Sequence, residues 1–312
     1  MCGLAGILYA DPEQNPDLSL ARAMTDAIAH RGPDGEGFHA EPGIVLGHRR
    51  LAVIDPAGGQ QPMYNEDNSV AIIFNGEIYN HEALRAELRQ RGHSFRNHCD
   101  TEAIVHAWES WGPDCVTRLS GMFAFALWDR ARRTLFCARD RLGKKPFYYA
   151  TTGGDFVFAS ELAALFALPN LPRRMRPEAV EDFFAFGYVP EPGTIFSGIE
   201  KLPASHTLLI ENGRAPVLRR YWSPPTHITP CTEADALIAM RAPPRRCGRH
   251  PPGRGCAARR VPVRWGRFQC RGRDSRRPAR HAARHFHDRL RRRRGRNPVR
   301  PHGRRPLRYA PA

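Results

Sequence analysis

A cysteine stands second in the chain, in the stretch MCGLAGIL, and this position suits a nucleophile. Removal of Met1 would leave Cys2 with a free α-amino group of pKa about 8 beside a thiol of pKa about 8.5. The amine could then accept the thiol proton of the same residue and generate the reactive thiolate. The alternative is that Cys2 is a small buried residue at the start of a strand, and position alone favours this alternative.

Two further stretches carry groups that suit binding of anions. HRRLAVID places Arg50 in the middle of an expected strand, where its guanidinium could hold a carboxylate through two parallel hydrogen bonds. FNGEIYN places Asn75 and Gly76 at an expected strand end, where a side-chain amide and a backbone N–H could bind an oxyanion. The alternatives are a surface charge on an edge strand for Arg50 and an ordinary turn for the Asn-Gly pair.

Asp100, in the stretch CDTE, directly precedes an expected helix. Its carboxylate could cap that helix or bind an ammonium group, and capping is the favoured interpretation. The stretch RGPDG at residues 31–35 predicts a turn in which glycine supplies conformational freedom.

Short apolar runs separated by glycine or polar turns predict strands, and helical periodicity predicts helices between them. The strands and helices occur in blocks and not in βαβ alternation, which predicts an α+β layered sandwich for residues 1 to about 165. One further helix and a short pair of strands are expected up to about residue 222. The expected strands are 3–10, 43–55, 69–80, 121–129, 134–140, 145–151 and 155–160, and the expected helices are 20–30, 81–92 behind an Asn80 cap, and 101–112.

An ordered set of motifs places these residues in a known context. MCGLAGI, RGPDG, HRRLAVID, QQPM, NGEIYN, DTE, LSGMFAFALWD and RDRLGKKPFYY follow one another from Cys2 to about Trp222. This set resembles the glutaminase domain of glutamine-dependent asparagine synthetase, a class II glutamine amidotransferase among the N-terminal-nucleophile hydrolases. The resemblance implies a four-layer αββα sandwich.

The resemblance also implies roles in the reaction with L-glutamine. Cys2 resembles the nucleophile that attacks the side-chain amide, with its own α-amino group as general base. Asn75 and Gly76 match the oxyanion-hole pair. Related amidotransferases of other biosynthetic pathways share these three residues, but RLAVID, GEIYN and RDRLGKKPFYY favour the asparagine synthetase branch.

The remaining site residues follow from the same resemblance. Arg50 matches the ligand of the substrate α-carboxylate, and Glu77 and Asp100 match the region that holds its α-ammonium group. No metal and no cofactor are expected for this half-reaction. In the full-length family, ATP and Mg²⁺ serve the conversion of aspartate to asparagine, and the SGG-x-DS motif that grips pyrophosphate is absent from this sequence.

Composition changes sharply near Arg241. Residues 241–312 hold 25 of the 48 Lys and Arg but only 2 of the 31 Asp and Glu, which leaves 23 basic and 29 acidic residues before them. The segment is rich in arginine and proline and poor in large aliphatic residues, so we expect it to be a disordered tail. The expected domains are 2–165 for the glutaminase core, 166–222 for its extension, 223–240 for a linker and the start of an aborted synthetase domain, and 241–312 for the tail.

We interpret the tail as the product of a frameshift between about Ala236 and Arg245. The segment around Trp265 can be back-translated so that reading one base later gives SGGVDS, the motif missing from the chain. Two alternatives are less favoured: a non-catalytic protein that binds nucleic acid through the arginines, and a zinc site formed by cysteines and histidines of the tail.

The sequence predicts a cytoplasmic protein. Five irregularly spaced cysteines precede the change in composition, which fits a reducing compartment better than a disulfide framework. The N-terminal apolar stretch lacks a basic leader, and no apolar run reaches the roughly 18 residues of a membrane span. The sequence makes no prediction about oligomeric state.

Overall fold

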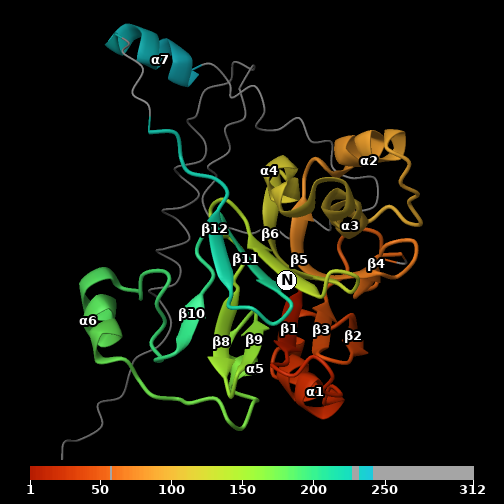
Figure 1. Ribbon diagram of the computed structural model, residues 1–312. Coiled ribbons are helices and arrows are strands. Elements are labelled where there is room, and N and C mark those ends of the chain that lie inside the picture. The colour runs from red at the N-terminus through yellow and green to blue at the C-terminus, as the bar shows by residue number, and fades with distance from the viewer. Residues whose placement is uncertain (57, 227–231, 242–312) are drawn as a thin grey trace, which may run out of the picture. The chain divides into compact units, whose positions relative to one another are not determined.

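Two six-stranded antiparallel sheets form the centre of the fold in the computed structural model, which describes residues 1–56, 58–226 and 232–241 (Figure 1). The strand order of the first sheet is β10, β8, β9, β1, β3, β2, and that of the second sheet is β12, β11, β7, β6, β5, β4. The first sheet contains β1 (Gly3–Leu8), β2 (Gly35–Glu41), β3 (Ile44–Arg50), β8 (Tyr148–Thr152), β9 (Asp155–Ala159) and β10 (Ile199–Lys201). The second contains β4 (Met63–Tyr64), β5 (Val70–Ile78), β6 (Gly121–Asp129), β7 (Thr134–Arg139), β11 (His206–Glu211) and β12 (Val217–Arg220).

Helices of the first unit of the chain cover the outer faces of both sheets. The α-helices are α1 (Leu18–Asp26), α2 (His81–Gln90), α3 (Asp100–Trp111), α4 (Cys115–Arg118), α5 (Leu162–Leu165), α6 (Pro177–Phe186) and α7 (Glu233–Arg241), with short 3₁₀ helices at Ala29–Arg31 and Gly112–Asp114. Helix α7 belongs to a second unit of the chain, and its first turn is capped by Thr232, whose hydroxyl accepts the N–H of Asp235.

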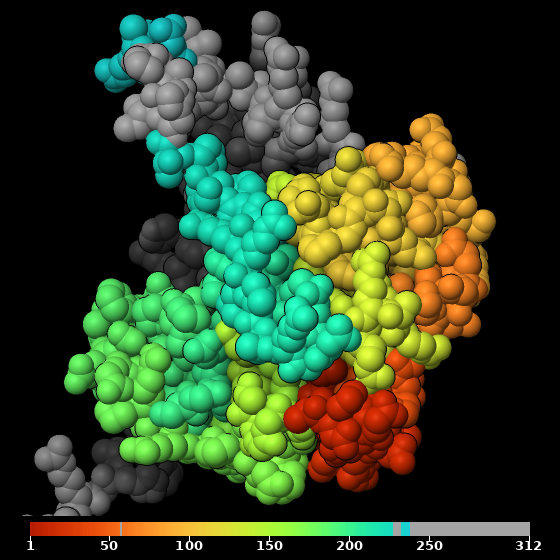
Figure 2. All heavy atoms as spheres, in the orientation of Figure 1, coloured from red at the N-terminus to blue at the C-terminus, as the bar shows by residue number. Residues whose placement is uncertain are grey.

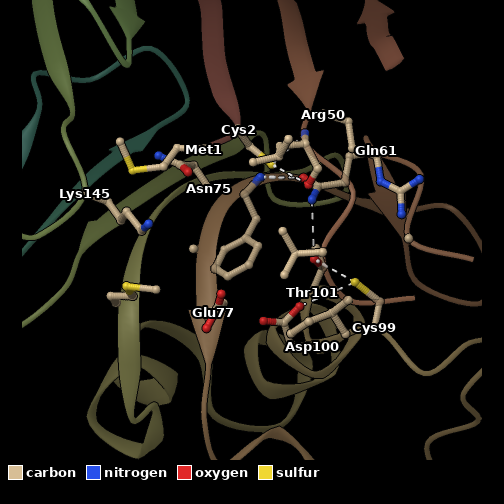
Figure 3. Close-up of a pocket in the computed structure, with 17 residues that line it drawn as sticks. Met1, Cys2, Arg50, Gln61, Asn75, Glu77, Cys99, Asp100, Thr101 and Lys145 are labelled. Carbon is tan, nitrogen blue, oxygen red and sulfur yellow. Dashed lines mark hydrogen bonds between the residues drawn. The ribbon is translucent and has the colours of Figure 1, made fainter. Parts of the chain in front are cut away.

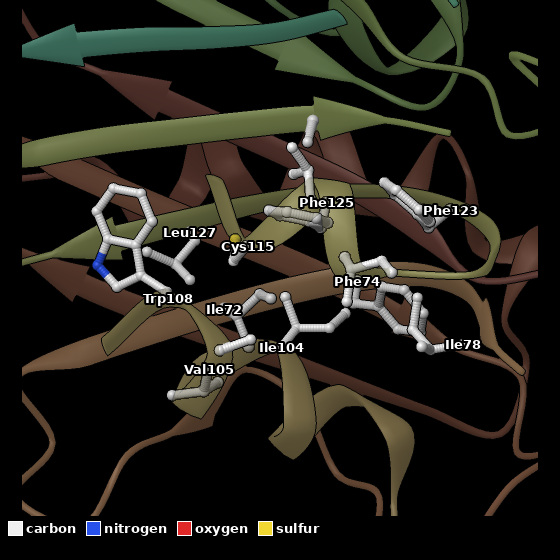
Figure 4. Packing of buried hydrophobic residues seen from close by; sticks show 14 of the residues in the cluster. Ile72, Phe74, Ile78, Ile104, Val105, Trp108, Cys115, Phe123, Phe125 and Leu127 are labelled. Carbon is white, nitrogen blue, oxygen red and sulfur yellow. The ribbon is translucent and has the colours of Figure 1, made fainter. Parts of the chain in front are cut away.

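Strand alternation divides the buried residues into three apolar layers. On β5, Ile72 and Phe74 pack against α3 (Figure 4), whereas Ala71 and Ile73 face the other sheet. On β1, Leu4 and Leu8 lie in the layer between the sheets, while Ala5 and Ile7 face α1 and α5. This arrangement confirms the expected four-layer αββα sandwich.

All seven strands expected from the apolar runs are present, and residues 166–222 add α6 and three strands that extend both sheets. The outermost of these, β12, is exposed along its whole length and lies at the surface in Figure 2. The predictions for residues 241–312, namely disorder, a shifted frame, nucleic-acid binding and a zinc site, lie almost wholly outside the described residues. Among the residues described, no helix combines the length and apolar character that a membrane span requires.

The expected cap of α2 needs a correction. Asn80 stands at the N-cap position, but its side chain makes no capping hydrogen bond. Instead its Oδ1 accepts the N–H of Ser120 and its Nδ2 donates to the carbonyl of Arg118. Asn80 therefore joins the start of α2 to the start of β6.

A buried histidine of the first sheet forms a hydrogen bond to the second sheet. His48 of β3 donates from Nε2 to the carbonyl of Phe74 on β5 at 3.1 Å, and its side chain is fully buried. Burial lowers the pKa of His48 to about 4. An unfolded histidine titrates near 6.5, so between pH 6.5 and 4 the unfolded chain binds more protons than the folded one, and stability is lost as pH falls through this range.

We expect His48→Gln to flatten this pH dependence. Between pH 7 and 4.5, His48 should cost the wild type about 2 to 3 kcal/mol of unfolding free energy. The fall in unfolding free energy over this range should be smaller in the variant by the same amount. Urea unfolding at both pH values measures the difference, with the exposed His98→Gln as the matched control. Equal pH slopes in wild type and His48→Gln would contradict the assignment.

Candidate active site

A pocket of about 220 Å³ lies where the space between the sheets opens, and all six residues selected from the sequence line it (Figure 3). The start of β1 and the end of β3 meet there with the end of β5 and the start of β6. The six are Cys2, Arg50, Asn75, Gly76, Glu77 and Asp100; the pocket is completed by Met1, Leu51, Val53, Ile54, Gly59, Gln61, Phe74, Cys99, Thr101, Met122 and Lys145. The six selected residues, which are up to 98 positions apart in the sequence, are thus brought together by the two sheets and the first turn of α3.

The Cys2 thiol lies against the backbone of Leu51. Its Sγ accepts the N–H of Leu51 at 3.4 Å and donates to the carbonyl of Leu51 at 3.6 Å. Burial raises the pKa of the thiol, which favours the neutral form and makes a nearby base necessary for reaction. Burial also lowers the pKa of the α-amino group of Met1, so an amine at this end of β1 is biased toward its proton-accepting form.

An ion pair fixes the backbone of Cys2 from outside the pocket. The Nε of Arg31 donates to the carbonyl of Cys2 at 2.9 Å, and its Nη1 donates to Glu161 at 2.6 Å. Arg31 is the first residue of the RGPDG stretch, and Asp34 of the same stretch accepts the N–H of Ala52 at 2.9 Å. This turn therefore holds both the nucleophile candidate and the segment against which its sulfur packs.

Asn75 and Gly76 lie inside β5, so the expected strand end is wrong. They pair with Ala124 and Phe123 of β6 in continuous antiparallel register. The Asn75 side chain is buried, and its Nδ2 has no hydrogen-bond partner among the described residues. A buried amide donor left free at a pocket wall is available to an oxyanion.

Close packing, and not a turn, requires glycine at position 76. A Cβ atom there would lie 2.2 Å from the carbonyl oxygen of Met122. Any larger residue would push β5 away from β6 and displace Asn75, the neighbouring residue. Gly76 thus keeps the backbone of the pocket wall in place.

Arg50 is the last residue of β3 and not the middle of a strand, which corrects the expectation. Its Nη2 donates to the carbonyl of Asp55 at 2.7 Å and its Nη1 to the carbonyl of Pro56 at 2.8 Å. The side chain is buried, so the surface-charge alternative is also wrong. Each terminal nitrogen carries a second N–H, so the guanidinium retains donors for a carboxylate ligand.

Asp100 does not cap its own helix, which corrects the favoured interpretation. Cys99 occupies the N-cap position, and the Oδ2 of Asp100 accepts the N–H of Ile78 at 2.8 Å. Burial raises the pKa of the Asp100 carboxyl. Figure 3 shows the carboxylates of Glu77 and Asp100 on the same side of the pocket. A pocket with a guanidinium and two acidic groups can hold the carboxylate and the ammonium of one amino acid.

Two pocket residues lie in motifs whose individual roles the sequence did not reveal. Gln61, from QQPM, accepts the N–H of Phe74 at 2.6 Å and donates to Thr101 at 3.4 Å, which joins β5 to α3. Lys145, from RDRLGKKPFYY, is largely buried and faces the pocket near Met1 (Figure 3). The preceding Asp140 accepts four backbone N–H groups, including that of Lys145, and so shapes this loop.

The fold is shared with a solved amidotransferase. Glutamine phosphoribosylpyrophosphate amidotransferase from B. subtilis superimposes with a TM-score of 0.52 at 18% identity, covering 72% of this chain and 50% of that one. At this level of identity the likeness concerns the fold alone.

Sequence comparison then gives the family. Residues 1–222 match the glutamine amidotransferase domain, and the chain belongs to this family. Glutamine-hydrolyzing asparagine synthetase 3 of Bacillus subtilis (strain 168) is 42% identical over 227 residues, covering 72% of this chain and 37% of the relative. Asparagine synthetase 3 of Arabidopsis thaliana is 35% identical over 241 residues, covering 76% and 36%. The chain spans little more than a third of the length of these relatives.

Proposed function

We propose that this chain hydrolyses L-glutamine to L-glutamate and ammonia through a thioester on Cys2. The observation that carries the proposal is the convergence in one pocket of a thiol, a free buried amide donor, a guanidinium and two acidic groups. Arg50 would bind the α-carboxylate of glutamine, and Glu77 with Asp100 would bind its α-ammonium group. The substrate side chain would then extend toward Cys2 and Asn75.

The reaction starts with removal of Met1, which makes the α-amino group of Cys2 the nearest base. This amine takes the thiol proton, and the thiolate attacks the Cδ of glutamine. The Nδ2 of Asn75 and the backbone N–H of Gly76 stabilise the resulting oxyanion. The C–N bond breaks as the protonated amine returns its proton to the leaving ammonia, and water then attacks the thioester to give glutamate and restore the thiol.

The names of the longer relatives suggest a destination for the ammonia. Their names, glutamine-hydrolyzing asparagine synthetases, indicate transfer of the glutamine nitrogen into asparagine. We propose that these relatives use aspartate, ATP and Mg²⁺ for that step in the part of their length that this chain does not match. We also propose that the glutaminase reaction needs no cofactor. The four described cysteines are free and three are buried thiols, which supports a reducing, cytoplasmic location.

Glutamate release from glutamine by the purified chain tests the proposal. We expect release by protein that has lost Met1, as established by intact mass, and no asparagine when aspartate, ATP and Mg²⁺ are added. Absence of glutamate from a folded chain without Met1 would contradict the glutaminase proposal. ATP-dependent formation of asparagine by this chain alone would contradict the assignment of the second step to residues outside it.

A further inference from the structure

Two histidines and two glutamates meet on the surface of the sandwich, outside the candidate active site. Glu66 follows β4, His93 follows α2, and His106 and Glu109 lie on α3. One ligand atom of each residue lies within 4.8 Å of the corresponding atoms of the other three. His106 is buried at the base of the cluster, and the other three side chains are partly exposed around it. None of the four lines the active-site pocket.

The distances between these atoms are close to those of a tetrahedral metal site. Glu109 Oε2 lies 2.8 Å from His106 Nδ1 and 3.6 Å from His93 Nδ1. Glu66 Oε2 lies 3.6 Å from His106 Nδ1, and Glu66 Oε1 lies 4.0 Å from His93 Nδ1. A zinc ion bound at 2.0–2.1 Å separates tetrahedral ligands by roughly 3.3 Å, so rotations of these side chains suffice to surround an ion.

Contacts outside the cluster already orient two of the ligands. The Nε2 of His93 lies 2.8 Å from the hydroxyl of Ser110, which directs Nδ1 toward the cluster. The Oε1 of Glu109 accepts the Nδ2 of Asn65 at 2.8 Å, which leaves Oε2 for the cluster. Metal-bound histidines and carboxylates characteristically have such partners on the atom that does not bind the metal.

The other two ligands are held in a similar way. The Oε1 of Glu66 accepts the N–H of Ser94 at 3.0 Å. The ring of Phe95 packs edge-on against His106 at 4.7 Å between centroids. The Nε2 of His106 has no hydrogen-bond partner among the described residues and lies 4.0 Å from Oε1 of Glu102. Without a metal, Nδ1 of His106 donates to Oε2 of Glu109 at 2.8 Å. A bound metal ion would replace that proton, and the N–H would then be at Nε2, on the side of Glu102.

We propose that Glu66, His93, His106 and Glu109 bind Zn²⁺. Two imidazole nitrogens and two carboxylate oxygens form a donor set that zinc accepts, whereas Mg²⁺ and Ca²⁺ favour oxygen ligands only. Two carboxylates beside neutral imidazoles carry a charge of −2, which balances the ion. The expectation of no metal concerned the glutaminase reaction, and this site lies apart from that chemistry.

The site has a structural role in the glutaminase fold. It joins the segments after β4 and after α2 to the C-terminal half of α3. The first turn of the same helix carries Asp100 and Thr101 into the active-site pocket. Zinc bound at one end of α3 therefore stabilises the helix that supports the acidic side of the pocket at its other end.

Zinc titration of the full chain tests the proposal. Protein stripped with a chelator is dialysed against Zn²⁺, bound zinc is measured by mass spectrometry, and thermal unfolding is recorded with and without the ion. Wild type and His98→Gln, an exposed histidine on the same segment, should bind one more zinc ion per chain than His93→Gln. Zinc should also raise the melting temperature of the first two proteins more than that of His93→Gln. Zinc bound by cysteines and histidines elsewhere in the chain is the same in all three proteins and therefore does not affect this difference.

Glu109→Gln provides a second variant, which keeps the shape of the side chain and an oxygen for Asn65. It should weaken zinc binding at this site at least tenfold if glutamate is a ligand. Equal zinc stoichiometry and equal melting shifts in wild type, His93→Gln and Glu109→Gln would overturn the proposal. The four residues would then form a hydrogen-bonded network without a metal.

Discussion

Replacement of Cys2 by alanine should reduce glutamate release from glutamine to background, a loss of roughly 10⁴-fold or more. The thiol supplies the atom that bonds to the substrate, so its removal eliminates the thioester route. The second thiol at the pocket cannot take its place. Cys99 is buried, donates toward Thr101 and Asp100, and burial raises its pKa to about 12.

The control for this variant separates chemistry from folding and processing. Cys115→Ala removes another thiol, from the core beneath α4, and should leave glutaminase activity within a few-fold of wild type. Alanine at position 2 is no larger than cysteine, so intact mass should show the same loss of Met1 in both proteins. Glutamate release that persists in Cys2→Ala, or in a wild-type chain that retains Met1, would exclude Cys2 and its amine from the proposed roles.

Strand periodicity explains why much of the site could be predicted from the sequence. Side chains two residues apart on a strand face the same side. Cys2, just before β1, is two residues from Leu4, and Asn75 on β5 is two residues from Ile73 and four from Ala71. Both sets face the space between the sheets, so residues chosen for their chemistry on separate apolar strands point toward one another. The seven strands with strong apolar character were found for the same reason. By contrast, β2 reads GEGFHAE and is a strand because it pairs along its length with β3.

The errors concern contacts that the residue types alone do not reveal. Asn-Gly suggests a turn locally, but the close approach of β6 keeps Gly76 within a strand. Asp100 suggests a cap, but its carboxylate accepts the N–H of Ile78 from another element. Arg50 suggests the middle of a strand, but it is the last residue of β3, and its guanidinium binds the carbonyls of Asp55 and Pro56 in the loop that follows. Such partners depend on how the folded chain brings segments together, which residue types and spacing do not specify.

Asn75→Ala should lower kcat by about 10²- to 10³-fold with little change in KM, because the side chain acts on the oxyanion that develops after glutamine has bound. The free protein should tolerate the change well. Nδ2 of Asn75 has no hydrogen-bond partner among the described residues, so its removal breaks no bond and relieves a buried polar group of its desolvation cost.

This combination distinguishes an oxyanion role from a structural one. Steady-state glutaminase kinetics and thermal unfolding, measured on the same preparation, should show a large fall in kcat with a melting temperature equal to or above that of wild type. Gly76→Ala offers the contrast: its Cβ would approach the Met122 carbonyl at 2.2 Å, so activity and stability should fall together. A parallel loss of activity and stability in Asn75→Ala, or an unchanged kcat, would mean that the unpaired amide at the pocket wall does not stabilise the transition state.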